Sequence, residues 1–152
     1  MCRKHQWQKI LPHKVPTIYR AVAEVESYEK FLPWCISSRV LERSQEPDEL
    51  RTEVKVGYQN LSSAFRSRVE LSPEKRVHAV SEPNEFIERL QFTWEFAPLK
   101  TGTRLDLMLD FKLRNPEHLL LWDIAHEKVI SEYVRCFSKR CVALELESGE
   151  RE

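Results

Sequence analysis

The sequence has few glycines, no long apolar run and no excess charge, and each scarcity excludes a class of protein. Its three glycines, Gly57, Gly102 and Gly149, are too few to form a phosphate-binding loop or a dinucleotide-binding fingerprint. The longest aliphatic and aromatic run, Leu119–Trp122, is far shorter than the roughly 20 residues of a membrane-spanning helix. The 24 basic and 24 acidic residues cancel, whereas dedicated nucleic-acid-binding proteins usually have a basic excess. We expect a soluble, single-domain protein.

Cysteine is also scarce. The four cysteines, Cys2, Cys35, Cys136 and Cys141, include no C-x-x-C pair and no zinc-binding spacing. Cys136 and Cys141 fall on a predicted helix, about 140° apart around its axis, so they cannot bridge each other. We expect four reduced thiols and a reducing compartment, either the cytosol or the mitochondrial matrix.

Acidic residues are missing from the N-terminal region, because none precedes Glu24. The basic residues there are Arg3, Lys4, Lys9, Lys14 and Arg20. Such a segment fits a transit peptide or a membrane-surface patch, and equally a first strand over Gln6–Leu11 with a chance imbalance of charge. It has no serine and no apolar signal-peptide core, so we expect any transit sequence to lie outside these 152 residues.

The middle of the chain, residues 36–115, alternates with a period of two. In the clearest run, every second residue from Leu105 to Leu113 is apolar. Similar runs occupy residues 50–56, 65–71 and 90–96, with a weaker strand at Val77–Ser81 and turn signals between them. This pattern predicts an antiparallel sheet with one wet face and one covered face, and cross-strand ion pairs on the wet face.

Two short helices are predicted after the first strand. Pro16–Val25 has apolar residues at i, i+3, i+4 and i+7, and proline suits its first turn. Ser27 is positioned to cap a second short helix through Phe31, which Pro33 would end.

A long helix is predicted near the C-terminal end, where Asn115 can cap it and Pro116 suits its first position. The pattern runs to about Leu146, which is roughly 45 Å of helix. Its apolar stripe is Leu119, Trp122, His126, Val129, Ile130, Tyr133, Phe137, Cys141 and Leu144. We therefore predict an α+β protein whose curved antiparallel sheet wraps around the long helix, with one domain over residues 6–146 and a polar tail over 147–152.

No group of residues carries a strong catalytic or metal-binding signature. His118 and His126 are about 12 Å apart along the predicted helix, too far to share a metal ion. Asp123 and Glu127 accompany His126 at helical spacing, which a solvated, carboxylate-rich helix surface readily produces. We expect no catalytic residue and no metal. The apolar residues between sheet and helix either fill a core or line a cavity; periodicity alone favours the core, although we expect His126 in a cavity wall.

The most distinctive segment is Tyr28–Cys35, which reads Y-E-K-F-L-P-W-C. It resembles the Y-x-x-F-x-P-W-C segment of the coenzyme Q-binding START-like proteins in the polyketide cyclase superfamily. The resemblance continues in order and at similar spacing, as far as an F-x-x-R motif at Phe137 and Arg140. It spans about Gln6 to Leu144, nearly the whole chain.

The resemblance implies the helix-grip fold, also called START-like or Bet v 1-like. It implies a non-enzymatic protein, without a catalytic cofactor, that binds ubiquinone or another polyprenyl quinone between sheet and helix. Such proteins support coenzyme Q synthesis and respiratory electron transport at the matrix side of the mitochondrial inner membrane. Peripheral contact with this membrane, partly through the basic N-terminal region, and with coenzyme Q biosynthetic proteins is implied, and no nucleic acid is expected.

In a carrier of this kind, a hydrophobic tunnel takes its walls from inward-facing residues, because an isoprenoid tail left in water costs about 25 cal/mol per Å². On the sheet side these residues are Val54, Val56, Phe65, Phe92, Trp94, Leu107, Leu109 and Phe111. On the helix side they are Trp122, His126, Val129, Ile130, Tyr133 and Phe137. We expect His126 or Tyr133 to hydrogen-bond a quinone oxygen. Pro33 and Trp34 would form a gate, or else a packed corner.

Two other functions stay open. Bacterial relatives include a ribosome-association toxin that acts on the large ribosomal subunit. That role needs a surface patch rather than a tunnel, and zero net charge makes contact with ribosomal RNA less natural. Other members of the superfamily are polyketide cyclase or dehydratase enzymes, which need acid–base groups inside the tunnel, where this sequence places almost none.

Overall fold

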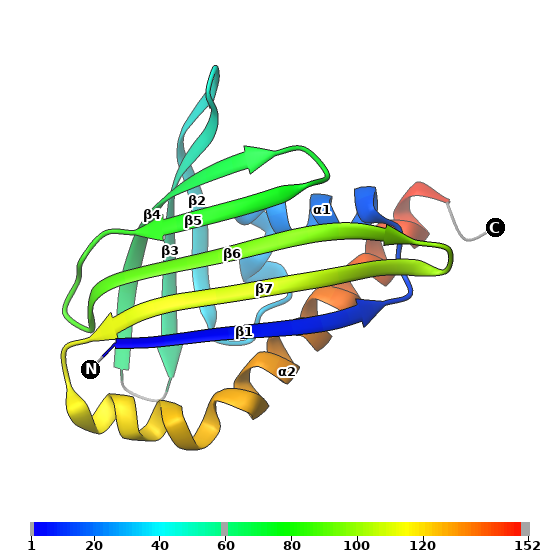
Figure 1. Cartoon of the computed structure of the whole chain (residues 1–152). Helices are drawn as coiled ribbons and strands as arrows, with labels where there is room; N and C mark the ends of the chain where they lie inside the picture. The colour runs from blue at the N-terminus through cyan, green and yellow to red at the C-terminus, as the bar shows by residue number, and fades with distance from the viewer. Residues whose placement is uncertain (1, 59–60, 150–152) are drawn as a thin grey trace.

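The computed structural model describes residues 2–58 and 61–149, which form seven strands and three helices (Figure 1). In chain order these are β1 (Cys2–Leu11), α1 (Val15–Ala23), the 3-10 helix η1 (Val25–Lys30), β2 (Cys35–Gln45), β3 (Asp48–Tyr58), β4 (Leu61–Ser72), β5 (Arg76–Ser81), β6 (Ile87–Leu99), β7 (Gly102–Leu113) and α2 (Pro116–Ser148). The predicted element order is confirmed: a strand, two short helices, a run of strands and a long helix.

The seven strands form one antiparallel sheet in the order β1-β7-β6-β5-β4-β3-β2. In Figure 1, β5, β6, β7 and β1 run across the view while β3 and β4 stand steeply, so the sheet is strongly curved. In β7 the buried positions alternate from Thr103 to Phe111, which confirms the predicted wet and covered faces. The fold is therefore the helix-grip arrangement, with α2 held against the curved sheet.

Ion pairs cover the wet face of the sheet, as the shared alternation of arginines and carboxylates predicts. The Glu53 carboxylate accepts hydrogen bonds from Arg39 and from Arg66, the latter at 2.9 Å. These two bonds hold the pKa of Glu53 below its ordinary range. Arg89 similarly donates to Asp110 at 2.7 Å across β6 and β7. The arginines of this face neutralise neighbouring carboxylates.

The long helix begins as predicted. The Asn115 side chain accepts a hydrogen bond from the backbone N–H of Glu117 at 2.8 Å, and Pro116 occupies the first turn. The helix extends two residues beyond the predicted end, through Ser148, and Gly149 then adopts a left-handed conformation with φ of 74°. Residues 147 and 148 of the predicted tail are therefore helical, and residues 150–152 lie outside the described residues.

The second short helix begins earlier than predicted. It starts at Val25 rather than after Ser27. The backbone N–H of Glu24 donates the last hydrogen bond of α1 to the Arg20 carbonyl, and the chain continues from there directly into 3-10 turns. Ser27 lies within these turns and its N–H donates to Glu24 O at 3.0 Å, so it is not the helix cap.

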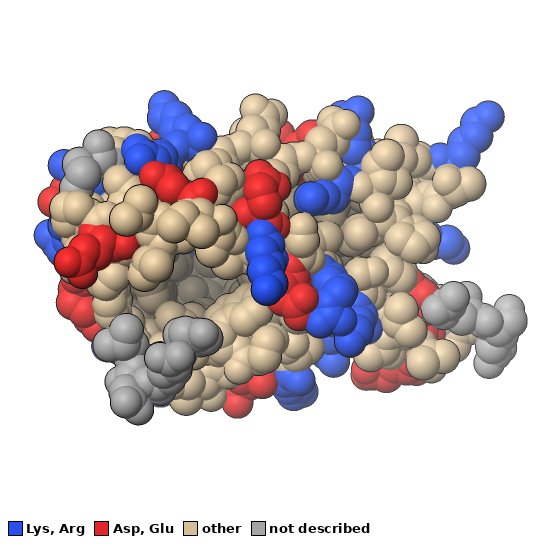
Figure 2. Space-filling view, turned by 90° about the horizontal axis from the view of Figure 1, so that it is seen from below, with Lys and Arg blue, Asp and Glu red and all other residues tan. Residues whose placement is uncertain are grey.

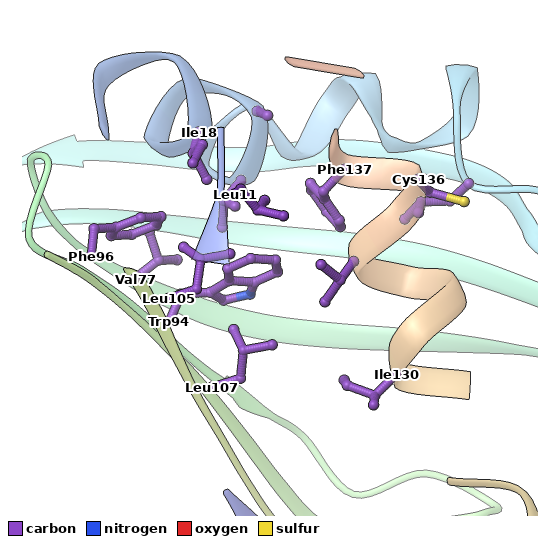
Figure 3. Close-up of a cluster of buried hydrophobic side chains, with 14 of the residues drawn as sticks. Leu11, Ile18, Val77, Trp94, Phe96, Leu105, Leu107, Ile130, Cys136 and Phe137 are labelled. Atoms are coloured by element: carbon purple, nitrogen blue, oxygen red, sulfur yellow. The ribbon is translucent and has the colours of Figure 1, made fainter. Parts of the chain in front are cut away.

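The core lies between the concave face of the sheet, α1 and the second half of α2 (Figure 3). Trp94 of β6 and Phe137 of α2 point toward each other there, with ring centroids 5.0 Å apart. Ile18 on α1 and Leu105 on β7 are completely buried in the same cluster.

No helix of the described chain is both long and apolar enough to traverse a bilayer. No cluster of three potential metal ligands occurs among residues 2–58 and 61–149.

Candidate ligand-binding site

An open cavity of about 850 Å³ lies between the first half of α2 and the sheet. Strands β3 and β4, the segment after η1 and the segment before β6 complete its wall. The lining residues are Trp34, Val56, Gly57, Ser62, Ser63, Phe65, Phe86, Leu121, Ile124, Ala125, Lys128, Val129 and Glu132. We call this space the outer cavity. Figure 2 shows the hollow from below, with mostly tan walls and charged side chains at its edge.

The wall chemistry suits an apolar ligand. Val56 and Phe65 line the wall from adjacent strands β3 and β4. The Ser63 hydroxyl beside them donates to a Glu85 carboxylate oxygen at 2.8 Å and accepts from the Asn84 amide at 3.3 Å. Its hydrogen-bonding capacity is thus largely used within the protein. A ligand in the outer cavity meets mainly carbon atoms, with few polar groups to fix its orientation.

A smaller inner chamber of about 100 Å³ lies deeper along the same strands. Val54 lines the inner chamber and Val56 lines the outer cavity, and residues two apart on β3 share one face of the sheet. The Trp34 ring, in the outer wall, stacks on the Tyr133 ring of the inner chamber with centroids 6.3 Å apart and planes at 25°. This ring pair lies where the two spaces adjoin.

Two tyrosines supply hydroxyl groups to the inner chamber. Burial raises the pKa of Tyr133 well above its ordinary value, so its hydroxyl stays neutral and can donate a hydrogen bond. Burial also raises the pKa of Tyr28, whose hydroxyl donates to the Val22 carbonyl. Tyr28 is thus engaged with the backbone of α1. A hydrogen bond between the side chains of Trp94 and Tyr133 offsets part of the effect of burial on the pKa of Tyr133. Because an indole N–H only donates, the Tyr133 hydroxyl accepts this bond and can still donate its own hydrogen to a ligand.

The structure distributes the predicted tunnel residues over several places. The outer cavity takes Trp34, Val56, Phe65 and Val129. The inner chamber takes Val54, Phe92, Trp94 and Tyr133. The packed core takes Leu107, Leu109, Phe111, Ile130 and Phe137. Of the two predicted gate residues, Trp34 lines the outer cavity, whereas Pro33 lines a neighbouring groove between α2 and η1. Strand and helix alternation identify the covered face but do not separate cavity wall from core.

His126 lies away from both the outer cavity and the inner chamber. Its ring packs against His5 of β1, with centroids 4.6 Å apart, and against Trp122. The Trp122 indole N–H donates to His5 Nε2 at 2.9 Å, so Trp122 also faces β1. The expectation that His126 and Trp122 line the cavity is therefore not met. Two sides of α2 are therefore covered: the side with Trp122 and His126 packs against β1, and the side with Ala125 and Val129 lines the outer cavity.

Sequence reasoning missed several residues of the outer cavity. Leu121, Ile124, Ala125 and Lys128 supply much of its α2 wall. The sequence feature that could have indicated them is the run of four consecutive apolar residues, Leu119–Trp122, near the start of the helix. Four consecutive residues extend around the whole helix and not only along one face. Leu121 is 64% exposed and Ile124 is 76% exposed, so they form an apolar edge at the cavity mouth.

A buried polar cluster far from the outer cavity was also missed. His13, in the turn between β1 and α1, hydrogen-bonds Glu145 through Nδ1 and Ser138 Oγ through Nε2, the latter at 3.0 Å. The Thr103 hydroxyl donates to the His13 carbonyl at 2.7 Å. The order serine, histidine, carboxylate matches that of a nucleophilic triad, but Ser138 lines neither the outer cavity nor the inner chamber. The cluster fastens the second half of α2 to the turn between β1 and α1, and through this turn to β7.

Residues 11–138 match the protein family described as "Polyketide cyclase / dehydrase and lipid transport". Because this match covers most of the chain, the protein belongs to this family, and the membership predicted from Tyr28–Cys35 is confirmed.

Two kinds of relative share the chain's sequence. The ribosome association toxin RatA of Rickettsia prowazekii is 33% identical over 114 residues, covering 71% of this chain and 75% of the relative. The mitochondrial coenzyme Q-binding protein COQ10 homolog B of Xenopus laevis is 28% identical over 136 residues, covering 87% of this chain. The chain spans 55% of the length of the Xenopus relative.

Solved structures share the fold at low sequence identity. A START superfamily protein from Mycobacterium smegmatis has a TM-score of 0.80 at 17% identity, covering 93% of this chain and 98% of that chain. The Zhui aromatase/cyclase from a Streptomyces species has a TM-score of 0.78 at 15% identity, covering 92% of this chain and 94% of that chain. These likenesses confirm the helix-grip fold.

Proposed function

We propose that this protein is a non-enzymatic carrier of ubiquinone, or of a closely similar polyprenyl quinone, held in the outer cavity. The observation that carries the proposal is the open space of about 850 Å³ with a mostly apolar wall. The likeness to a coenzyme Q-binding protein supports a quinone as the occupant. A lipid with a long isoprenoid tail and a small polar ring suits a wall that offers few hydrogen bonds.

The size of the outer cavity limits how much of the ligand it encloses. A volume of about 850 Å³ falls within the range of about 300–1,000 Å³ that small-molecule sites occupy, so it suits a quinone ring and the nearest part of the tail rather than a complete long tail. The rest of a longer tail would extend past Leu121 and Ile124 at the mouth, toward a membrane or a partner protein.

Tyr133 remains our proposed hydrogen-bond donor to a quinone oxygen. It lines the inner chamber behind Trp34, and its neutral hydroxyl suits a carbonyl acceptor. A rotation of the Trp34 side chain would open the outer cavity toward this hydroxyl, which gives Trp34 the role of an internal gate.

The carrier function requires no catalytic residue. Charged groups in the described part of the outer cavity wall are limited to Lys128 and Glu132, and Arg135 donates two hydrogen bonds to the Glu132 carboxylate. We therefore propose ligand binding without catalysis and without a catalytic cofactor. The likeness to a mitochondrial coenzyme Q-binding protein supports a mitochondrial site of action. Within the mitochondrion, we propose the matrix side of the inner membrane, with coenzyme Q biosynthetic proteins as partners in quinone synthesis and respiration.

Quinone binding to a wall variant tests this function. Val56→Glu places a carboxylate in the apolar wall, and Ile10→Glu makes the same change on β1 at a side chain that is 67% exposed. Titration with a short-chain ubiquinone, followed by quenching of tryptophan fluorescence, should show at least a tenfold weaker affinity for Val56→Glu alone. Absence of binding to the wild-type protein, or unchanged affinity of a folded Val56→Glu variant, would refute the proposal.

Ribosome association is the second candidate, because the Rickettsia relative named for it shares 33% identity with this chain. The two functions need different surfaces, so they separate experimentally. Co-sedimentation of the protein with large ribosomal subunits through a salt series, unaffected by Val56→Glu, would favour this candidate. A cyclase-like activity, suggested by the fold shared with the Zhui enzyme, would instead require turnover of a polyketide substrate.

A further inference from the structure

Beside the outer cavity lies a second hollow of about 380 Å³, which we call the basic groove. It lies between η1, with the segment that follows it, and the second half of α2. Its lining residues are Lys30, Phe31, Pro33, Glu132, Arg135, Cys136, Lys139, Arg140 and Ala143. Four of these are basic and one is acidic, in a protein whose total charge is zero.

The positive charge of the basic groove is largely uncompensated. Arg135 binds Glu132, with Nε 3.0 Å from a carboxylate oxygen, so the groove's acidic residue is already neutralised. Within residues 2–58 and 61–149, no ion pair joins Lys30, Lys139 or Arg140 to a carboxylate. This differs from the wet face of the sheet, where the arginines pair with nearby carboxylates. An anion is the ligand that this charge distribution favours.

An aromatic ring forms part of the groove. The Arg140 guanidinium lies 5.7 Å from the centroid of the Phe31 ring, which holds the charged group over an apolar surface. Pro33 adds another apolar wall. A phosphate headgroup with carbon atoms attached would therefore contact both the cations and the ring, whereas free inorganic phosphate would contact the cations alone.

The basic groove is continuous with the mouth of the outer cavity. Glu132 lines both hollows, and Pro33 of the groove precedes Trp34 of the cavity wall. Along α2, Lys128, Glu132, Arg135 and Lys139 follow one another at steps of three and four residues, so they share one face of the helix. Figure 2 shows Lys and Arg side chains to the right of the hollow, with Asp or Glu side chains between them, as the alternation of Glu132 with basic residues on this helix face requires.

The other edge of the mouth is apolar. Leu120 is 62% exposed, and the even more exposed Leu121 and Ile124 are its neighbours on the first half of α2. A helix that exposes leucine and isoleucine near one end and uncompensated lysine and arginine further along matches a surface with both hydrocarbon and negative charge. An RNA surface would satisfy the cations but leave these apolar side chains in water.

We infer that the basic groove binds the phosphate headgroup of an anionic lipid, and that this contact docks the mouth of the outer cavity on an anionic membrane. The exposed leucines and isoleucine then enter the hydrocarbon edge of the bilayer, and a ligand tail passes between bilayer and cavity without crossing water. The inference rests on the proposed function only for the identity of the cargo; the docking itself requires no quinone.

Vesicle flotation tests the inference with variants of equal charge change. The groove variant is Lys30→Gln/Lys139→Gln/Arg140→Gln. The control, which also tests the basic N-terminal region as the docking surface, is Lys4→Gln/Lys9→Gln/Lys14→Gln. The probes are phosphatidylcholine vesicles with and without phosphatidylglycerol. We expect the wild-type protein and the control to bind the anionic vesicles, and the groove variant to bind roughly 100-fold more weakly, since each cation near the surface contributes about a fivefold factor.

Three results would overturn the inference: equal binding by wild type and groove variant, loss of binding in the control alone, or loss of poly(U) RNA binding in a groove variant that still floats with vesicles. A second variant, Ile124→Gln, should weaken vesicle binding while leaving the charge unchanged.

Titration with short-chain ubiquinone in solution separates this inference from the carrier function. The groove variant should keep wild-type quinone affinity, and groove-dependent flotation of a protein without quinone affinity would refute the carrier function alone.

Discussion

Replacing Phe137 with alanine tests where the packed core ends and the ligand site begins. The resemblance to coenzyme Q-binding proteins implies that Phe137 lies in a tunnel wall, whereas the structure buries its side chain completely. Its ring centroid lies 5.0 Å from those of Phe31, Trp94 and Tyr133. Truncation therefore removes a large ring from a closely packed aromatic cluster.

The size of the effect follows from this burial. Replacing a buried phenylalanine with alanine costs about 3–5 kcal/mol, because apolar contacts are lost and the neighbours fill the void only partly. For a chain of this length, the melting temperature should fall by roughly 6–20 °C, at about 2–4 °C per kcal/mol. Thermal and urea denaturation followed by circular dichroism measure both quantities.

Val129→Ala is the matched control on the same helix. Its side chain is 44% exposed and lines the outer cavity, so truncation should change the free energy of unfolding by no more than about 0.5 kcal/mol. A similarly small change for Phe137→Ala would refute the reasoning. It would mean that the space around Phe137 is open, as a continuous tunnel requires.

Three further outcomes concern the rest of the molecule. His13→Ala should lower the free energy of unfolding by about 1–3 kcal/mol in urea denaturation, because it removes a hydrogen-bond partner of the buried Glu145. Arginine hydrogen bonds hold the pKa of Glu53 below its ordinary 4.5, so the unfolded chain takes up the proton first as pH falls. Stability should therefore decrease below about pH 5, and less steeply in Glu53→Gln. Iodoacetamide at about pH 8 should label exposed Cys2 in the native protein but not Cys141, because burial raises the pKa of the Cys141 thiol to about 12.

Each of these outcomes has a clear contradiction. Unchanged urea stability of His13→Ala would mean that the polar cluster does not fasten α2. Identical pH profiles of wild type and Glu53→Gln would remove Glu53 from the acid dependence. Labelling of Cys141 as fast as Cys2 in the folded protein, mapped by mass spectrometry, would contradict the packing around the second half of α2.

The fold was largely predictable from local patterns. Alternation in residues 104–113 fixes which side of β7 is covered, because strand side chains alternate between faces. Asn115 and Pro116 mark the start of α2, because their chemistry suits a helix cap and a first turn. The start of η1 was missed because η1 follows α1 almost without a break, so Ser27, the expected cap, lies inside the turns of η1.

The ligand site was predictable only in part. Alternation cannot distinguish Val56 from Leu107, since a strand residue that faces a cavity has the same period as one that faces a core. Val56 lines the outer cavity while Leu107 is fully buried, and the difference depends on where α1 and α2 cover the sheet. His126 was misplaced because a stripe on a helix wheel does not show which side contacts β1.

Contacts between distant segments were beyond the reach of sequence patterns. His13 and Glu145 are 132 residues apart, and no local motif around either residue indicates that they meet. The basic groove likewise combines Lys30 of η1 with Lys139 and Arg140 of α2. Such sites form only when the fold brings two distant segments together, and neither segment has a distinctive sequence motif of its own.

The most direct test of the carrier function is to identify what the purified protein carries. Organic extraction of the native protein, followed by mass spectrometry of the extract, should yield a polyprenyl quinone at close to one molecule per chain, and its mass would give the length of the tail. The same extraction from Val56→Glu should yield little quinone. An extract from the wild-type protein that contains only phospholipid, or no lipid, would contradict the central claim.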